Sequence, residues 1–198
     1  MALPGLPELD LASLAASFAM ALLLVILTFL VVTTYNDVVG LRLRIDKAWA
    51  NIDVILRQRH DQLPALVDAV RGVLEFEREV LDEVTRSRAG YRPEAPIPDQ
   101  ASTSEATTEA IRSLFAVVER YPDLKSQANV LALQESIERL EAMLAARREL
   151  YNDQVYRYNT RIQQLPGLLL AGPFRWRARQ FFEAPPAAAA VPEVAPLT

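Results

Sequence analysis

The chain has 198 residues with 25 acidic and 21 basic side chains, which give a net charge of −4 and a pI near 5.2. This balance argues against nucleic-acid binding, which requires clustered positive charge. The sequence contains no cysteine, which excludes disulfides, thiolate chemistry and a lipoprotein anchor. Glycine is scarce and no stretch alternates as a β-strand does, so the expected fold class is all-α.

The first predicted element is an apolar helix. Residues 11–36 carry no charged side chain, and residues 14–32 are apolar apart from two hydroxyl groups. A helix of about 20 apolar residues is long enough to cross the ~30 Å hydrocarbon core of a bilayer. The sequence therefore predicts a transmembrane anchor over residues 11–34, preceded by a short segment, residues 1–10.

A cleaved secretory signal peptide is the alternative interpretation. It is disfavoured because residues 1–10 contain no Lys or Arg and no A-x-A cleavage motif follows the apolar stretch. Cytoplasmic flanks of membrane helices are enriched in basic residues, and Arg42, Arg44 and Lys47 follow the anchor. We expect a single-pass protein of the bacterial inner membrane, with its N-terminus outside and its C-terminal domain in the cytoplasm.

The anchor is expected to continue into an amphipathic helix. Apolar residues recur after it at steps of three and four, namely Leu41, Ile45, Ala48, Ile52 and Ile55. No proline interrupts residues 11–63, so the helix can run on as a rigid stalk. Pro64 is expected to stop or kink it, because proline removes a donor and restricts the preceding residue. Asp61 is then placed to cap the next helix.

Three further helices are expected. The first runs to about Ala89 and is followed by a proline-rich loop at residues 90–100. Ser102 and Glu105 form a capping-box pattern that opens the second, which ends before Tyr121. The third covers residues 125–164, with apolar residues at Val130, Leu133, Ile137, Leu140, Leu144, Tyr151, Val155, Tyr158 and Ile162.

Four helices around one apolar seam predict an up-and-down four-helix bundle over residues 35–169. Arg147 and Arg148 occupy the place in the last helix where an apolar residue is expected. We expect them to form a buried or half-buried ion pair with another helix. The Pro/Ala-rich tail, residues 184–198, is not expected to pack.

The densest polar cluster contains Arg57, Arg59, His60 and Asp61. Two interpretations stand beside each other: helix capping with interhelical pairing, or an interaction surface. His60 is the one histidine of the chain, so no pair of imidazoles can bind a metal. No phosphate loop or activated nucleophile is recognisable. The sequence predicts no catalytic residue, no metal site and no cofactor.

A second unusual segment, residues 172–183, alternates aromatic and basic residues: Phe174, Arg175, Trp176, Arg177, Arg179, Phe181 and Phe182. This composition is typical of a segment at a membrane surface, attracted to anionic lipid headgroups. The alternative is that Phe181 and Phe182 pack onto the helical bundle.

Several blocks of the chain resemble the LemA family of bacterial membrane proteins. They are YND at 35–37, AWANIDV at 48–54, RQRHDQLPALV at 57–67, ERYPDLK at 119–125, ARRELYN at 146–152, YN at 158–159 and FFE at 181–183. Gln58, Gln62 and Ala65 depart from the usual family pattern. The resemblance implies an N-terminal anchor and a cytoplasmic four-helix bundle, and it implies no reaction.

Together these features predict a membrane-tethered interaction or scaffold protein without catalytic activity of its own. The alternative is an accessory or regulatory subunit of a membrane enzyme, such as a metallopeptidase. The expected partners are the lipid bilayer and an unidentified protein, and oligomerisation is left open.

Overall fold

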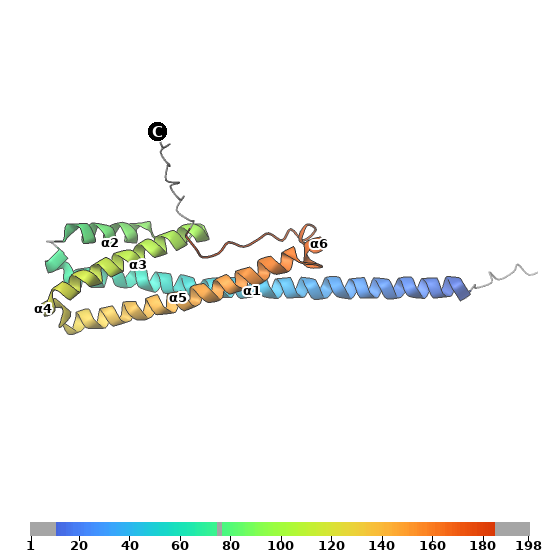
Figure 1. The fold of residues 1–198 in the computed structure, drawn as a ribbon, viewed down its shortest axis with the longest axis horizontal. Helices are drawn as coiled ribbons and strands as arrows, with labels where there is room; N and C mark the ends of the chain where they lie inside the picture. Colours follow the sequence, from blue (N-terminus) through green and yellow to red (C-terminus); the bar gives the residue numbers. More distant parts are fainter. Residues whose placement is uncertain (1–10, 75–76, 185–198) are drawn as a thin grey trace, which may run out of the picture. The chain divides into compact units, whose positions relative to one another are not determined.

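The computed structural model describes residues 11–74 and 77–184, which form helices and no β-strand. The helices are α1 (Leu11–Leu74), α2 (Arg78–Gly90), α3 (Ile97–Arg120), α4 (Pro122–Lys125), α5 (Ala128–Gln163) and α6 (Gly167–Ala171), drawn in Figure 1. The protein is all-α, as its composition predicted. The expected N-terminal segment at 1–10 and nearly all of the 184–198 tail lie outside the described residues.

The described chain divides into two compact units. The anchor unit comprises residues 11–43 and 157–178, and the core unit comprises residues 44–156 and 179–184 without residues 75–76. Helices α1 and α5 each contribute to both units. The anchor unit contains a stretch of α1 that is long and apolar enough to cross a membrane, and none of that stretch is buried in the protein.

Helix α1 continues through Pro64 to Leu74, so the stop predicted there is wrong, and the alternative, a kink, stays a prediction. A proline inside a helix costs about 3 kcal/mol. The neighbouring Leu63, Leu66 and Val70 are at most 1% exposed. Burial of such side chains contributes about 1.5–3 kcal/mol each, which offsets the penalty. Asp61 therefore lies inside α1 and caps no helix.

Helix α3 begins at Ile97, earlier than the predicted capping box at Ser102. Proline is tolerated in the first turn of a helix, where the backbone N–H groups have no intrahelical acceptor, so Pro98 does not prevent this start. The Ser102 hydroxyl instead donates to the Pro98 carbonyl at 3.0 Å. The Gln100 side-chain amide donates to the Pro93 and Ala95 carbonyls, each at 2.9 Å, and holds the preceding turn.

The last long helix is shorter than predicted. The short helix α4 precedes it, and α5 covers Ala128–Gln163 instead of residues 125–164. Its predicted apolar residues pack as expected, since Val130, Ile137, Leu140 and Tyr151 are all less than 5% exposed.

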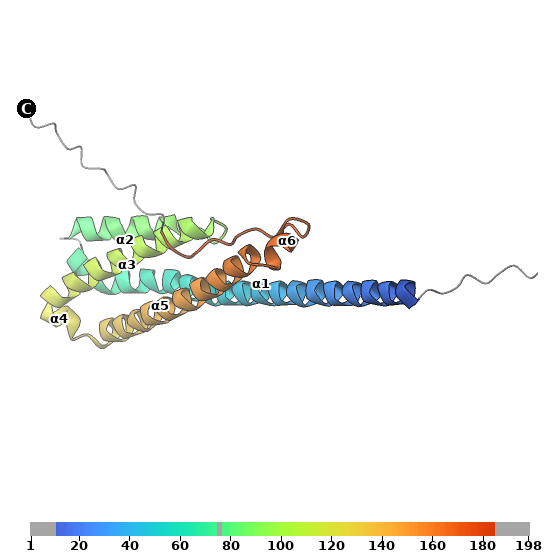
Figure 2. The ribbon, with the colours of Figure 1, turned by 45° about the vertical axis from the view of Figure 1, so that its right-hand side comes forward.

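Contacts within the core unit define the helix directions. Successive residues of α1 contact successively earlier residues of α5. The pairs in contact are Trp49–Tyr151, Arg59–Glu141 and Gln62–Ser136. The same holds for α2 and α3, since Glu77 lies near Arg120 and Gly90 near Thr103. Figures 1 and 2 both show α2 and α3 side by side. These neighbours are antiparallel. The complete four-helix bundle stays a prediction.

The main apolar cluster of the core unit draws on α1, α2, α3, α4 and α5. Its members share almost complete burial and include Leu63, Leu66, Val84, Ile111, Leu114, Val118, Leu124, Val130 and Ile137. Because all five elements contribute, the core unit is closed by long-range packing and not by local propensity alone.

Candidate functional site

Arg59, one of the four residues of the polar cluster, lies inside the core unit at 2% exposure. Its guanidinium forms an ion pair with Glu141 and donates to the Thr108 hydroxyl at 2.9 Å. It also donates to the Ser104 carbonyl at 2.8 Å. Interhelical pairing is thus the role of Arg59, which connects α1 with α3 and α5. Arg59 does not belong to an interaction surface, because no partner can reach it.

The other three residues of this cluster lie at or near the surface. The His60 ring lies 4.9 Å from the Tyr91 ring, centroid to centroid, and its Nδ1 is 3.5 Å from an Asp61 oxygen. Arg57 pairs with Asp53 at 2.9 Å. The hydrogen bond and charge of Asp53 raise the pKa of Arg57, and burial raises the pKa of Tyr91. An interaction surface at these residues stays a prediction.

The structure adds a groove that the sequence analysis did not predict, here called the α1/α5 groove. It is lined by Arg44, Lys47, Ala48, Asn51, Arg147, Leu150 and Gln154. None of these residues is acidic, and Arg44, Lys47 and Arg147 form no ion pair with any carboxylate that the structure describes. The groove is therefore a concentrated positive surface on a protein of net negative charge.

Further residues on the same faces of α1 and α5 continue the two walls of this groove. On α1, Lys47, Asn51 and Val54 are spaced by four and three residues, so they lie on one face. On α5 the same spacing relates Met143, Arg147, Leu150 and Gln154. Val54, Met143 and Leu150 are exposed by 53%, 44% and 42%. The two helices thus present large apolar side chains beside the three cations.

The positions of Arg147 and Arg148 correct a second prediction. Both side chains are exposed, not buried or half-buried in the seam. Arg148 does pair with another helix, at 3.5 Å from Glu105 of α3, but on the surface. The seam at this level is occupied by the rings of Trp49 and Tyr151, whose centroids lie 5.7 Å apart. These two large rings fill the space for which an aliphatic residue at position 147 or 148 was expected.

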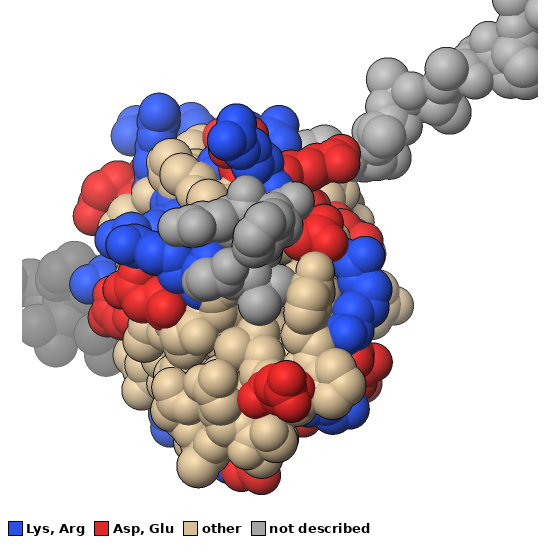
Figure 3. Space-filling model, turned by 90° about the vertical axis from the view of Figure 1, so that its left-hand side faces the viewer, with Lys and Arg blue, Asp and Glu red and all other residues tan. Residues whose placement is uncertain are grey.

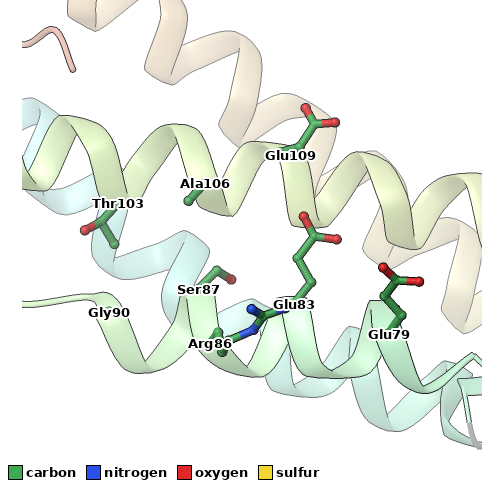
Figure 4. Close-up of a pocket in the computed structure, with 8 residues that line it drawn as sticks. All are labelled: Glu79, Glu83, Arg86, Ser87, Gly90, Thr103, Ala106 and Glu109. Carbon is green, nitrogen blue, oxygen red and sulfur yellow. The ribbon is translucent and has the colours of Figure 1, made fainter. Parts of the chain in front are cut away.

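A second groove, between α2 and α3, has the opposite charge. Figure 4 shows Glu79, Glu83 and Arg86 on α2 and Glu109 on α3 around small residues such as Ala106. Within the described part of the chain, no three His, Asp or Glu side chains come together so that they can hold a metal ion. On the end view in Figure 3, acidic and basic side chains are interspersed without one large area of a single sign.

The aromatic-basic segment is divided between the two units. In the anchor unit, Phe174 and Trp176 stack on each other at 5.4 Å and lie 5.1 and 6.2 Å from the Tyr35 ring. Arg175 and Arg177 are exposed.

In the core unit, Phe182 is 1% exposed and contacts the Trp49 ring. Phe182 therefore packs onto the helices and is not a membrane contact, and Phe181 beside it is partly buried. The Phe182 backbone N–H donates to the Asn152 side chain at 2.8 Å. Arg179 lies 3.4 Å from an Asp46 carboxylate oxygen. Apolar contacts and hydrogen bonds thus fix this end of the segment.

These observations define an all-α protein with an apolar helix of membrane-spanning length and a helical core unit that carries a basic groove. The family model for the LemA family matches residues 48–195. The chain belongs to the LemA family, as the sequence blocks predicted. A search among curated proteins finds no match.

Proposed function

We propose that this protein is a membrane-tethered interaction protein that has no catalytic activity of its own and binds its partner in the α1/α5 groove. The observation that carries the proposal is the composition of that groove. Three cations that form no ion pair with a described carboxylate lie beside the exposed side chains of Val54, Met143 and Leu150. An amphipathic helix with acidic residues along the edge of its apolar face has the complementary chemistry.

The proposed location follows from the charges next to the apolar stretch. Residues 11–33 of α1 are all exposed, as expected for side chains that face lipid. Arg42, Arg44 and Lys47 follow this stretch, which favours a cytoplasmic core unit in the bacterial inner membrane. A phosphatase that is active only after export, fused to the C-terminus, should be inactive. Strong phosphatase activity in intact cells would reverse the orientation.

Site-specific photo-crosslinking in native membranes tests the groove. A photoreactive phenylalanine analogue is placed at Asn51 in the groove and, as a control, at Arg112 of α3, whose side chain is 71% exposed. We expect a discrete adduct at position 51 and none at 112. The double variant Arg44→Glu/Arg147→Glu should abolish the adduct, because reversed charges repel an acidic partner.

Three outcomes contradict the proposal: equal labelling at both positions, no labelling at position 51, or an adduct that survives charge reversal. Mass spectrometry of the adduct then identifies the partner. If the partner is a membrane metallopeptidase whose turnover changes on addition of the purified protein, the alternative function, an accessory subunit, is correct. A partner that binds without a change in turnover favours the scaffold.

A further inference from the structure

Within the anchor unit, other segments of the chain begin to pack on α1 just beyond the end of its apolar stretch. Every residue from 11 to 33 is exposed, and Thr34 is the first buried one, at 1% exposure. The apolar stretch ends at Val32, two residues earlier, which is about 3 Å along a helix axis. The segments that pack on α1 therefore begin where the proposed membrane span ends.

The covering residues come from the end of α5 and the segment that follows it. The Arg161 guanidinium donates to the Asp37 carboxylate at 2.6 Å. The Phe174 and Trp176 rings lie 5.1 and 6.2 Å from the ring of Tyr35. Residues 161–176 are thus held beside α1 by one ion pair and by a group of three aromatic rings.

Between these two attachments lies an uncharged stretch of chain that carries several exposed apolar side chains. Residues 162–174 contain no charged side chain. Leu165, Leu168 and Leu169 are exposed by 69%, 54% and 70%, and Phe174 by 43%. Four large apolar side chains exposed within ten residues form a patch of the kind that marks a binding or membrane surface.

The depth of this patch can be worked out along α1. Tyr35 lies three residues beyond Val32, about 4.5 Å further along the axis. The headgroup layer on each side of a bilayer is roughly 5–7 Å thick, and Tyr and Trp are enriched in it. Tyr35 therefore lies at the depth of the headgroups, and so do the Phe174 and Trp176 rings packed beside it.

We propose that Leu165, Leu168, Leu169 and Phe174 form a membrane foot that lies in the headgroup layer beside the point where α1 leaves the bilayer. Its occupant is an anionic phospholipid surface, because Arg175 and Arg177 flank the apolar patch with exposed cations. The inference rests on the membrane span of the proposed function and adds a second contact of the same chain with the same leaflet.

The absence of cysteine permits a direct test with the full chain in vesicles that contain phosphatidylglycerol. Single variants Leu169→Cys, Phe18→Cys and Leu131→Cys are labelled with an environment-sensitive fluorophore, and circular dichroism checks their folding. Leu169 reports the foot and Phe18 the apolar part of α1. Leu131, an exposed leucine of α5 in the core unit, is the matched control. Spin-labelled lipids that quench either at the headgroup or deep in the acyl chains measure the depth of each probe.

The foot predicts a blue-shifted probe at position 169 that is quenched most by the headgroup label. The probe at 18 should be quenched most by the deep label, and the probe at 131 by neither. Adding Leu168→Glu should remove the quenching at 169, because a carboxylate is repelled by an anionic surface. A probe at 169 that behaves like the one at 131, while 18 is quenched, overturns the foot alone. Absence of quenching at 18 overturns the membrane anchor itself.

Discussion

The buried ion pair between Arg59 and Glu141 allows a sharp test of what stabilises the core unit. Only 3% of the Arg59 side chain is exposed, and its counter-charge is the carboxylate of Glu141, whose side chain is 24% exposed. In the variant Glu141→Ala, Arg59 keeps its neutral acceptors on Ser104 and Thr108 but loses its counter-charge. Removal of one partner from a buried pair typically costs about 3–5 kcal/mol.

The lower end of that range applies here, because the partial exposure of Glu141 lets water reach the vacated position. A cost of ~3 kcal/mol lowers the melting temperature of a protein of this size by roughly 6–12 °C. Thermal denaturation of the full chain in detergent, followed by circular dichroism, measures it. The control is Arg112→Met, which removes a pair with both side chains more than 60% exposed and should cost less than about 1 kcal/mol.

A double variant completes this test. Arg59→Met combined with Glu141→Leu removes both charges and fills their space with apolar atoms, so the double variant should recover most of the stability lost in Glu141→Ala. The reasoning fails if Glu141→Ala costs no more than the Arg112→Met control. Such a result would mean that water solvates the Arg59 guanidinium in the folded protein.

Three further predictions concern single positions. Leu140→Asp places an unpaired carboxylate where the leucine is 4% exposed. It should cost several kcal/mol in chemical denaturation, and wild-type stability would mean that Leu140 is not core. Gly167→Ala should lower the melting temperature, because a Cβ there would lie 2.2 Å from the Arg161 backbone oxygen, and an unchanged value would show that this contact relaxes.

Burial raises the pKa of the Tyr151 phenol to about 12 from its ordinary value of 10, so folding favours the protonated form. That stabilisation is complete below pH 10 and is lost between pH 10 and about 12. Tyr151→Phe should lack this loss in denaturation experiments, and equal pH dependence would exclude the phenol as its source.

The amino-acid sequence determined the fold class and the positions of most core residues. Heptad-like spacing placed Ile45, Ile52, Ile137 and Leu140 on buried faces, and each is less than 5% exposed in the structure. These residues are predictable because an amphipathic helix has one way to bury its apolar face. The apolar stretch of α1 and the LemA family blocks could likewise be recognised from the sequence, without any tertiary information.

Local signals failed where long-range packing competes with them. Pro64 and the capping pattern at Ser102 both predicted helix ends that the structure does not have. Burial around Pro64 outweighs the lost hydrogen bond, and Ser102 has a local acceptor in the Pro98 carbonyl. A propensity is worth at most a few kcal/mol, so tertiary contacts override it readily.

Only the tertiary structure separated the charged residues that lie buried in the core from those that lie exposed at the surface. Arg57 and Arg59 are two positions apart, yet Arg57 is exposed, whereas Arg59 is buried in the core and paired with Glu141. The α1/α5 groove brings Lys47 together with Arg147, and the anchor unit brings Tyr35 together with Phe174, although the two residues of each pair are at least 100 positions apart. No local pattern encodes such pairs, because tertiary packing brings them together: α5 runs antiparallel to α1 in the core unit, and the segment after α6 lies beside α1 in the anchor unit.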